Sequence, residues 1–388
     1  MTTKGKLRAL LQWTYALSMM AAAPAALAQV NIGVILSLTG PGASLGIPAN
    51  ETIPLWPAQI GGQPVKVTIL NDNTDTTTAA NAARRLIQES NVDVIVGPSL
   101  TPMSLAVLPV VAESRVPMIS LAGGGAIVEP MDANRRWSFK LSPTETITTS
   151  LVLDHMKRNG ATSLGVIALA NAYGDGFMKV VEKMAPEKGI KIVATERYGL
   201  TDQSVVAQAL KVSSAKPDAV FIVASGTPGA LPHVTLVQRG YKGAIYQTQG
   251  VANNDFLRVG GKDLDGGLMS VAPILVAEQL PESSPIRPVA MDYVNRFEAK
   301  HGPGSRSLFG GTAWDAQLLL QAAVPTALKA AKPGTPEFRT ALRDALEGLR
   351  NVVGSQAVFN MSGNDHNGVD DRSQVLVRIE GGKWRLVK

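Results

Sequence analysis

The 388-residue sequence contains no cysteine. This absence excludes disulfides, iron–sulfur clusters, cysteine-ligated zinc and a thiolate nucleophile, and it leaves no cysteine to carry a lipid anchor. Charged residues are few, at 18%, while hydrophobic residues make up 45%. This balance is typical of a well-packed globular protein and not of a disordered one. The length is sufficient for two domains of ordinary size.

Basic runs with interleaved aromatics are also absent. The formal net charge is +6, but the Lys and Arg residues are scattered, and three of the positive charges, Lys4, Lys6 and Arg8, lie close to the N-terminus. A nucleic-acid-binding surface needs clustered basic residues. We therefore expect no nucleic acid among the partners of this protein.

Residues 1–28 have the layout of a secretory signal peptide. A basic start is followed by a long apolar run, and Ala26-Leu27-Ala28 precedes Gln29. A membrane anchor is the alternative, but Pro24 and the small-residue end favour cleavage. No other apolar run approaches the roughly 20 residues that a spanning helix needs. We expect a soluble protein of the Gram-negative periplasm that is not lipid-anchored.

From Val30 onward, apolar β-branched runs alternate with amphipathic stretches of helical length. The predicted strands are 30–36, 65–70, 92–96, 117–121, 163–169, 191–198, 218–223 and 243–249. The predicted helices include 77–90, 146–160 and 175–189. Continuous apolar strands that alternate with helices indicate parallel sheets covered on both faces. An early helix at roughly 48–60 contains several prolines, which predict a short or kinked element.

The alternation restarts after Trp137-Ser138-Phe139-Lys140, gives way to helices after about residue 285, and ends in a predicted β-hairpin. This pattern predicts an α/β fold of two doubly wound parallel-sheet lobes joined by a three-stranded hinge near residues 141, 272 and 355. The first lobe would comprise residues 29–141 and 273–354, and the second lobe residues 142–272 and 355–388.

The segment from residue 91 to 125 is the most informative for function. Two predicted strands run into loops of small residues, GPSLTP and AGGG. Ligands bind at the carboxyl ends of the strands in open parallel sheets. Thr101 followed by Pro102 predicts a helix start with Thr101 as N-cap and with free amides at Met103 and Ser104. The Thr101 hydroxyl could bind a ligand carboxylate, or the residue could simply cap the helix.

Motifs of enzymes and metal sites are missing. Neither HExxH nor GxSxG occurs, and Gly123-Gly124-Gly125 matches no phosphate-binding loop. The NDNTD segment lacks the spacing of a calcium loop, so we interpret Asp75 as a helix start. We expect a binding protein without a cofactor or bound metal. The enzyme alternative predicts turnover of a ligand that a binding protein would return unchanged.

Several ordered segments carry a family resemblance. They are Leu38-Thr39-Gly40, VDVIVGPSLTP, VPMISLAG, Ala172-Tyr173-Gly174-Asp175-Gly176 and Trp314-Asp315-Ala316. Over nearly the whole mature chain, the sequence resembles the periplasmic solute-binding proteins of branched-chain amino acid type ABC transporters, which have the type I periplasmic binding fold. The resemblance implies a monomeric hinged clamp that closes on a small molecule and delivers it to a membrane permease.

The resemblance also implies site residues, carried over position by position. They are Leu45, Thr101, the loop residues Ala122, Gly123 and Gly124, Tyr173, Gln249 and Phe309. Gln249 takes the position of the acidic residue that holds an amino acid's ammonium, and Gly124 takes the position of a loop threonine. Tyr173 and Phe309 could flank a ligand or simply pack the lobes.

The neutral Gln249 changes the expected ligand, because an unpaired buried ammonium would cost several kcal/mol. The resemblance to a subgroup with IGG-x-x-V, TDTTTA and PSLTP segments implies an aromatic carboxylate of the benzoate or coumarate type, held by Thr101, the helix amides and the AGGG amides. Its ring could stack on Tyr173 or Phe309. An amino acid ligand, or a sensor that signals to a receptor, are the alternatives.

Overall fold

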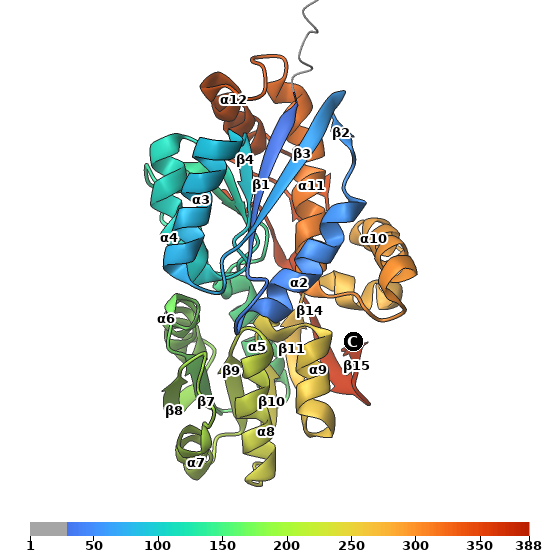
Figure 1. The fold of residues 1–388 in the computed structure, drawn as a ribbon. Coiled ribbons are helices and arrows are strands. Elements are labelled where there is room, and N and C mark those ends of the chain that lie inside the picture. Colours follow the sequence, from blue (N-terminus) through green and yellow to red (C-terminus); the bar gives the residue numbers. More distant parts are fainter. Residues whose placement is uncertain (1–28, 388) are drawn as a thin grey trace, which may run out of the picture.

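The computed structural model describes residues 29–387, so the predicted signal peptide lies outside the described residues. Two sheets form two lobes stacked end to end (Figure 1). The sheet of the first lobe has the strand order β2-β3-β1-β4-β5-β6, and that of the second lobe has the order β15-β14-β11-β10-β9-β7-β8. The strands between β1 and β11 pair in parallel apart from the β2–β3 pair, while β14 and β15 add an antiparallel edge to the second sheet. The predicted two-lobe α/β fold is confirmed.

The strands have the following bounds: β1 Val30–Leu36, β2 Gln59–Ile60, β3 Gln63–Asn71, β4 Val94–Val96, β5 Met118–Ser120, β6 Ser138–Lys140, β7 Ser163–Leu169, β8 Lys191–Tyr198, β9 Ala219–Val223, β10 Ala244–Gln247, β11 Leu268–Val271, β12 Val352–Val353, β13 Val358–Phe359, β14 Val375–Glu380 and β15 Lys383–Leu386. All eight strands predicted from the sequence form: β1, β7 and β8 have the predicted bounds, β3 is longer, and β4, β5, β9 and β10 are shorter.

The helices have the following bounds: α2 Ala43–Thr52, α3 Thr76–Ser90, α4 Thr101–Ser114, α5 Glu145–Arg158, α6 Ala172–Glu187, α7 Val206–Ser214, α8 Ala230–Gln238, α9 Asn254–Gly260, α10 Ile286–His301, α11 Leu308–Ala327 and α12 Pro336–Glu347. No helix within residues 29–387 is both long and apolar enough to cross a membrane.

Strand β1 shows why the first lobe has three layers. Ile32 and Val34 pack with α11 and α12 in one core cluster, while Ile35 packs with α3 and α4 in another. Side chains of a strand point alternately to the two faces of its sheet, so an apolar residue at nearly every position requires helices on both faces. Gly33 lets α3 approach, because a Cβ there would lie 2.9 Å from Cδ1 of Leu86.

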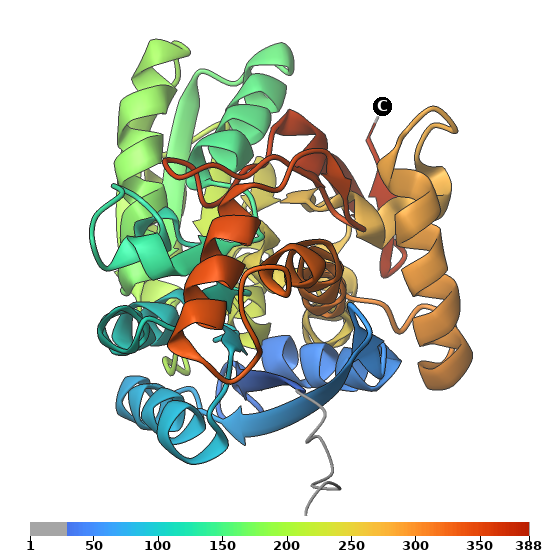
Figure 2. The same ribbon diagram turned by 90° about the horizontal axis from the view of Figure 1, so that it is seen from above.

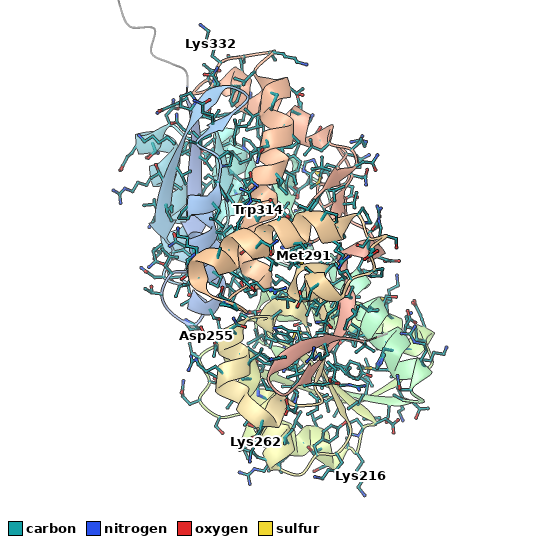
Figure 3. The ribbon with its side chains drawn as sticks, turned by 90° about the vertical axis from the view of Figure 1, so that its right-hand side faces the viewer. Lys216, Asp255, Lys262, Met291, Trp314 and Lys332 are labelled. Atoms are coloured by element: carbon teal, nitrogen blue, oxygen red, sulfur yellow. The ribbon has the colours of Figure 1, made fainter. Side chains whose placement is uncertain are left out.

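The second lobe repeats this arrangement. Val166 of β7 packs with α5 and α6, whereas Ile167 packs with the cluster that contains α7 and α8. Seen from above, α10 lies at the edge of the molecule on the side of the C-terminal strand (Figure 2). The side-chain view shows the length of the molecule, with Lys332 near the end of the first lobe, Lys216 near that of the second, and Trp314 between them (Figure 3).

Within the described residues the chain passes between the lobes three times: after β6, after β11, and after the β12–β13 hairpin. Ala357, Phe359 and Met361 of this hairpin region belong to the core of the first lobe, although the sequence-based division assigns residues after 354 to the second lobe. The third passage therefore lies after Met361.

The starts of α3 and α2 can be compared with the helix starts predicted from the sequence. Asp75 accepts a hydrogen bond from the amide of Thr78 at 2.7 Å and caps α3, as predicted. The early helix runs from Ala43 to Thr52 with Pro48 inside it, so the predicted range of 48–60 was wrong. A short 3-10 segment, Ile53–Leu55, follows α2 in place of further helical turns. Pro54 lies in its first turn, where the missing N–H of proline is tolerated.

Candidate ligand-binding site

A cavity of about 30 Å³ lies where the carboxyl ends of parallel strands from the two lobes face each other. Its lining comes from the ends of β4, β5, β6, β9 and β10 and from the first turns of α2, α4, α6 and α11. The lining residues are Leu45, Ser99, Leu100, Thr101, Pro102, Leu121, Gly123, Ser142, Tyr173, Ser225, Gln249, Gly250, Leu308 and Phe309. A cavity of this size holds one or two water molecules, so the walls from the two lobes lie close together here.

The lobes contact each other directly around this cavity. The amide of Thr227 in the second lobe donates to the Ser44 hydroxyl in the first at 3.2 Å. On another side, the amide of Leu308 donates to the Ala252 carbonyl at 3.4 Å. These bonds join the two lobes on two sides of the cavity.

Thr101 lies on the first-lobe side of the cavity, but it does not cap α4. The N-cap position belongs to Leu100, which provides no side-chain hydrogen bond. The Thr101 hydroxyl oxygen instead accepts from the amide of Gly124 at 3.0 Å. Because this bond occupies the oxygen, the hydroxyl proton remains available for donation to a ligand. The amide of Ser104 was predicted to be free, but this was wrong, because it donates to the Leu100 carbonyl at 3.0 Å.

The AGGG loop supports the wall of the cavity more than it offers donors to a ligand. The amide of Ala122 donates to the Ser120 hydroxyl at 3.1 Å, and that of Gly124 donates to Thr101. The fold itself therefore uses the amides of Ala122, Gly124 and Gly125, and the predicted grip by loop amides is limited to Gly123, which lines the cavity. A Cβ at Gly124 would lie 2.4 Å from Cγ2 of Thr101, so only glycine permits this close approach.

Glu145 is a buried carboxylate that joins the two lobes. It begins α5 in the second lobe, and its two oxygens accept from the Gly125 amide of the first lobe at 2.8 and 3.0 Å. A Cβ at Gly176 would lie 2.5 Å from the Oε1 atom of Glu145. Glycines of both lobes thus enclose this carboxylate next to the cavity wall. Our reading of the sequence missed Glu145, since nothing in its local pattern marks it.

Two aromatic side chains line the cavity from different lobes. Tyr173 belongs to the first turn of α6, and its ring lies 4.9 Å from that of Phe177 between centroids. Phe309 belongs to the first turn of α11 and is also buried. The Tyr173 hydroxyl lies near Thr248 and the Gly250 backbone but meets no full hydrogen-bond geometry with the described residues. Burial raises the pKa of this phenol, and these two polar neighbours offset only part of that effect. It stays protonated and can donate to a ligand.

Gln249 lies on the second-lobe side, just after β10, and is buried. Its Oε1 atom accepts from the Nε2 atom of Gln374 at 2.7 Å. The Oε1 atom of Gln374 in turn accepts from the hydroxyl of Ser270. A Cβ at Gly123 would lie 3.9 Å from the Gln249 Nε2 atom, so the amide donor of Gln249 faces the cavity.

The electrostatics of the cavity follow from its lining. Among the described residues no charged side chain lines it, and hydroxyl groups come from Ser99, Ser142, Ser225, Thr101 and Tyr173. The N-termini of α4, α6 and α11 reach the lining, and a helix N-terminus favours negative charge. No group of three or more His, Asp or Glu residues within 29–387 is placed to hold a metal ion.

Of the residues predicted for the site, six line the cavity: Leu45, Thr101, Gly123, Tyr173, Gln249 and Phe309. Ala122 and Gly124 lie behind the lining and shape it through Ser120 and Thr101. Ser99, Ser142 and Ser225 line it without having been predicted. Each follows a parallel strand, so applying the strand-end rule to every strand would have found them.

Comparisons with known proteins place these features in context. A family model for periplasmic binding proteins matches residues 29–383. The chain is similar to an extracellular ligand-binding receptor from Rhodopseudomonas palustris HaA2, with 40% identity, a TM-score of 0.90, and coverage of 93% of this chain and 100% of that chain.

Two further similarities are more distant. Leu/Ile/Val-binding protein homolog 3 of Brucella melitensis is 23% identical over 289 residues, which is 72% of this chain and 75% of that protein. A solute-binding protein of an ABC transporter from R. palustris, solved in complex with benzoate, has 19% identity and a TM-score of 0.79, and the match covers 92% of this chain and 95% of that one. At this identity the likeness is one of fold.

Proposed function

The chain belongs to the periplasmic binding protein family, and from this premise we propose that it is the periplasmic binding component of an ABC importer. It captures a small carboxylate between its two lobes and delivers it to a membrane permease. The ligand we propose is an aromatic acid of the benzoate or hydroxycinnamate type.

The observation that carries this ligand class is the neutral, donor-rich lining with Gln249 on the second-lobe side. A ligand ammonium needs a carboxylate close by, because burial of an unpaired charge costs several kcal/mol. The described lining offers no carboxylate, and the Gln249 amide donor faces the cavity. An anion without an amine meets no such penalty.

The first lobe supplies the groups that would hold the carboxylate. The hydroxyl proton of Thr101 is free to donate, and α4 begins at this residue without a side-chain cap. A carboxylate placed there gains from the helix dipole and from charge-assisted hydrogen bonds.

The rest of the lining suits an aromatic ring. Leu45, Leu100 and Leu308 supply apolar surface, and Tyr173 and Phe309 supply rings, which favour offset or edge-to-face contact with another ring. The R. palustris protein solved with benzoate has the same fold, and this likeness supports the proposal.

Isothermal titration calorimetry with two compound sets tests the proposal. One set holds benzoate, 4-hydroxybenzoate and 4-coumarate, and the other holds leucine, isoleucine and valine. We expect binding of at least one aromatic acid and none of the amino acids. Mass spectrometry of small molecules released from the purified protein provides an independent identification. Binding of leucine without binding of any aromatic acid would overturn the ligand assignment.

An amino acid ligand is the second candidate, favoured by the similarity to the Leu/Ile/Val-binding protein homolog. In that case the ammonium would have to be held by neutral acceptors such as the hydroxyl oxygens of Ser142 and Ser225, which line the cavity. The same calorimetric panel separates the two candidates, because the compound sets differ in the ammonium group.

A further inference from the structure

We propose that Gln374, which does not line the cavity, is a positioning residue that selects which end of the Gln249 amide faces the ligand. Through this selection it requires the ligand group opposite Gln249 to be a hydrogen-bond acceptor. The inference rests on the proposed function, since it specifies the chemistry that the same cavity accepts.

The three residues involved come from neighbouring strands of the second sheet. Gln249 follows β10, Ser270 lies in β11, and Gln374 immediately precedes β14, while the strand order places β11 between β10 and β14. All three side chains are buried, so water cannot exchange freely with their hydrogen bonds. Each polar atom in this row must find a partner in the protein or in the ligand.

The hydrogen bonds run in one direction through the row. The Ser270 hydroxyl donates to Oε1 of Gln374, and Nε2 of Gln374 donates to Oε1 of Gln249 at 2.7 Å. Gln249 thus has its acceptor end satisfied inside the second lobe. Its Nε2 atom makes no hydrogen bond to the described residues and lies on the side of Gly123, across the cavity.

This arrangement discriminates between ligands of similar shape. A ligand oxygen that accepts hydrogen bonds can pair with the Gln249 amide donor. A ligand N–H at the same place would face this donor, and both buried donors would then be left unpaired. Sites built around a buried hydrogen bond reject ligands that leave such groups unpaired by a wide margin, on the order of tenfold or more. An ammonium group is rejected for the same reason, in addition to its missing counter-charge.

Gln374→Glu tests the role of Gln374 directly. A carboxylate only accepts hydrogen bonds, so Gln249 would have to donate to Glu at this position and turn its carbonyl oxygen towards the cavity. We expect the wild type to bind 3- or 4-methoxybenzoate more tightly than the matching aminobenzoate, and the variant to reverse this preference by about tenfold. Calorimetry with both probes measures the ratio of dissociation constants.

The carboxylate introduced by Gln374→Glu could disturb folding, and circular dichroism would reveal this. Two further variants keep the test decisive in that case. Gln374→Leu and Ser270→Ala both interrupt the row without adding charge, and we expect each to reduce the preference for the methoxy probe. Gln203→Glu adds the same charge at an exposed position of the second lobe and should leave the preference unchanged.

A measurement without ligand separates this inference from the proposed function. In the wild type the side-chain NH₂ protons of Gln249, assigned by their loss in Gln249→Leu, should show a nuclear Overhauser effect to the Hα protons of Gly123. In Gln374→Glu this effect should disappear. If it persists, and if the probe ratio is the same in all variants, the role of Gln374 is refuted. If the wild type shows the effect but binds no aromatic acid, the ligand class falls while the positioning role stands.

Discussion

The carboxylate of Glu145 should act as a latch that holds the two lobes closed. It extends from the first turn of α5 in the second lobe to the Gly125 amide of the first lobe, with both oxygens within 3.0 Å of the amide nitrogen. The bond joins groups on opposite sides of the boundary between the lobes, so separation of the lobes stretches or breaks it. Removing it should favour the open form.

The size of the effect follows from the kind of bond. Hydrogen bonds to charged groups contribute about 1.5–3 kcal/mol, and each 1.4 kcal/mol changes an equilibrium constant about tenfold. Because ligand affinity falls in proportion to the population of the closed form, Glu145→Ala should weaken binding by roughly 10- to 100-fold. Glu145→Gln keeps one acceptor without the charge and should lose about half of that free energy.

Two measurements check this prediction. Calorimetry with whichever acid of the calorimetric panel binds gives the dissociation constants, and small-angle X-ray scattering of the ligand-free proteins gives the radius of gyration, which should increase in the variants. Gly176→Ala provides a second perturbation of the same contact, since its Cβ would lie 2.5 Å from Oε1 of Glu145. Glu187→Gln removes an exposed carboxylate from the same lobe and serves as the control.

The latch is refuted if Glu145→Ala and Gly176→Ala keep both the affinity and the radius of gyration of the wild type. A loss of affinity with an unchanged radius would also contradict it, since the effect would then arise in the cavity wall and not in closure.

Three further perturbations give separate outcomes. Burial raises the pKa of Asp315 from 3.8 to about 7, so the folded state binds its proton more tightly than the unfolded chain does. Its stabilising contribution is full below about pH 4 and is lost as the pH rises through about 7; melting temperatures should fall over this range in the wild type, and Asp315→Asn should remove that part of the slope. Gly124→Ala should destabilise the fold by about 1–3 kcal/mol through its clash with Thr101, measured by denaturant unfolding, whereas Gly348→Ala, which meets only ordinary contacts, should not. Tyr173→Phe removes a buried hydroxyl whose polar neighbours, Thr248 and the Gly250 backbone, lie outside full hydrogen-bond geometry, so it should raise or preserve the melting temperature. A lowered melting temperature would show that these neighbours bond the hydroxyl in the ligand-free protein.

Local sequence patterns were sufficient for most of the secondary structure. The apolar β-branched runs were recognisable as strands because both faces of their sheets are covered by helices. In β1, for example, the neighbouring residues Val34 and Ile35 pack into different core clusters on the two faces. Asp75 capped its helix as expected, because capping depends only on residues a few positions away. The same reasoning failed at Thr101, whose hydroxyl found a more distant partner in Gly124.

The extent of the first lobe shows a second limit. The β12–β13 hairpin packs into the first lobe through Phe359 and Met361, beyond the boundary that the sequence pattern suggested. Short strands carry little periodic signal, so packing against α11 and α12 decides where such a hairpin lies.

By itself the sequence determined the two-lobe α/β fold, the strand ends where a ligand would bind, and a neutral glutamine at position 249, because these depend on residue type and on local periodicity. Only the tertiary structure decided which polar groups remain available to a ligand. The amide of Gly124 is used by Thr101, Glu145 joins the lobes, and Gln374 orients Gln249. Gln374 and Gln249 are 125 positions apart in the chain, and Glu145 bonds a loop that follows a different strand. Such pairings exist only once the chain has folded, since each buried polar group must take a partner that packing brings within reach.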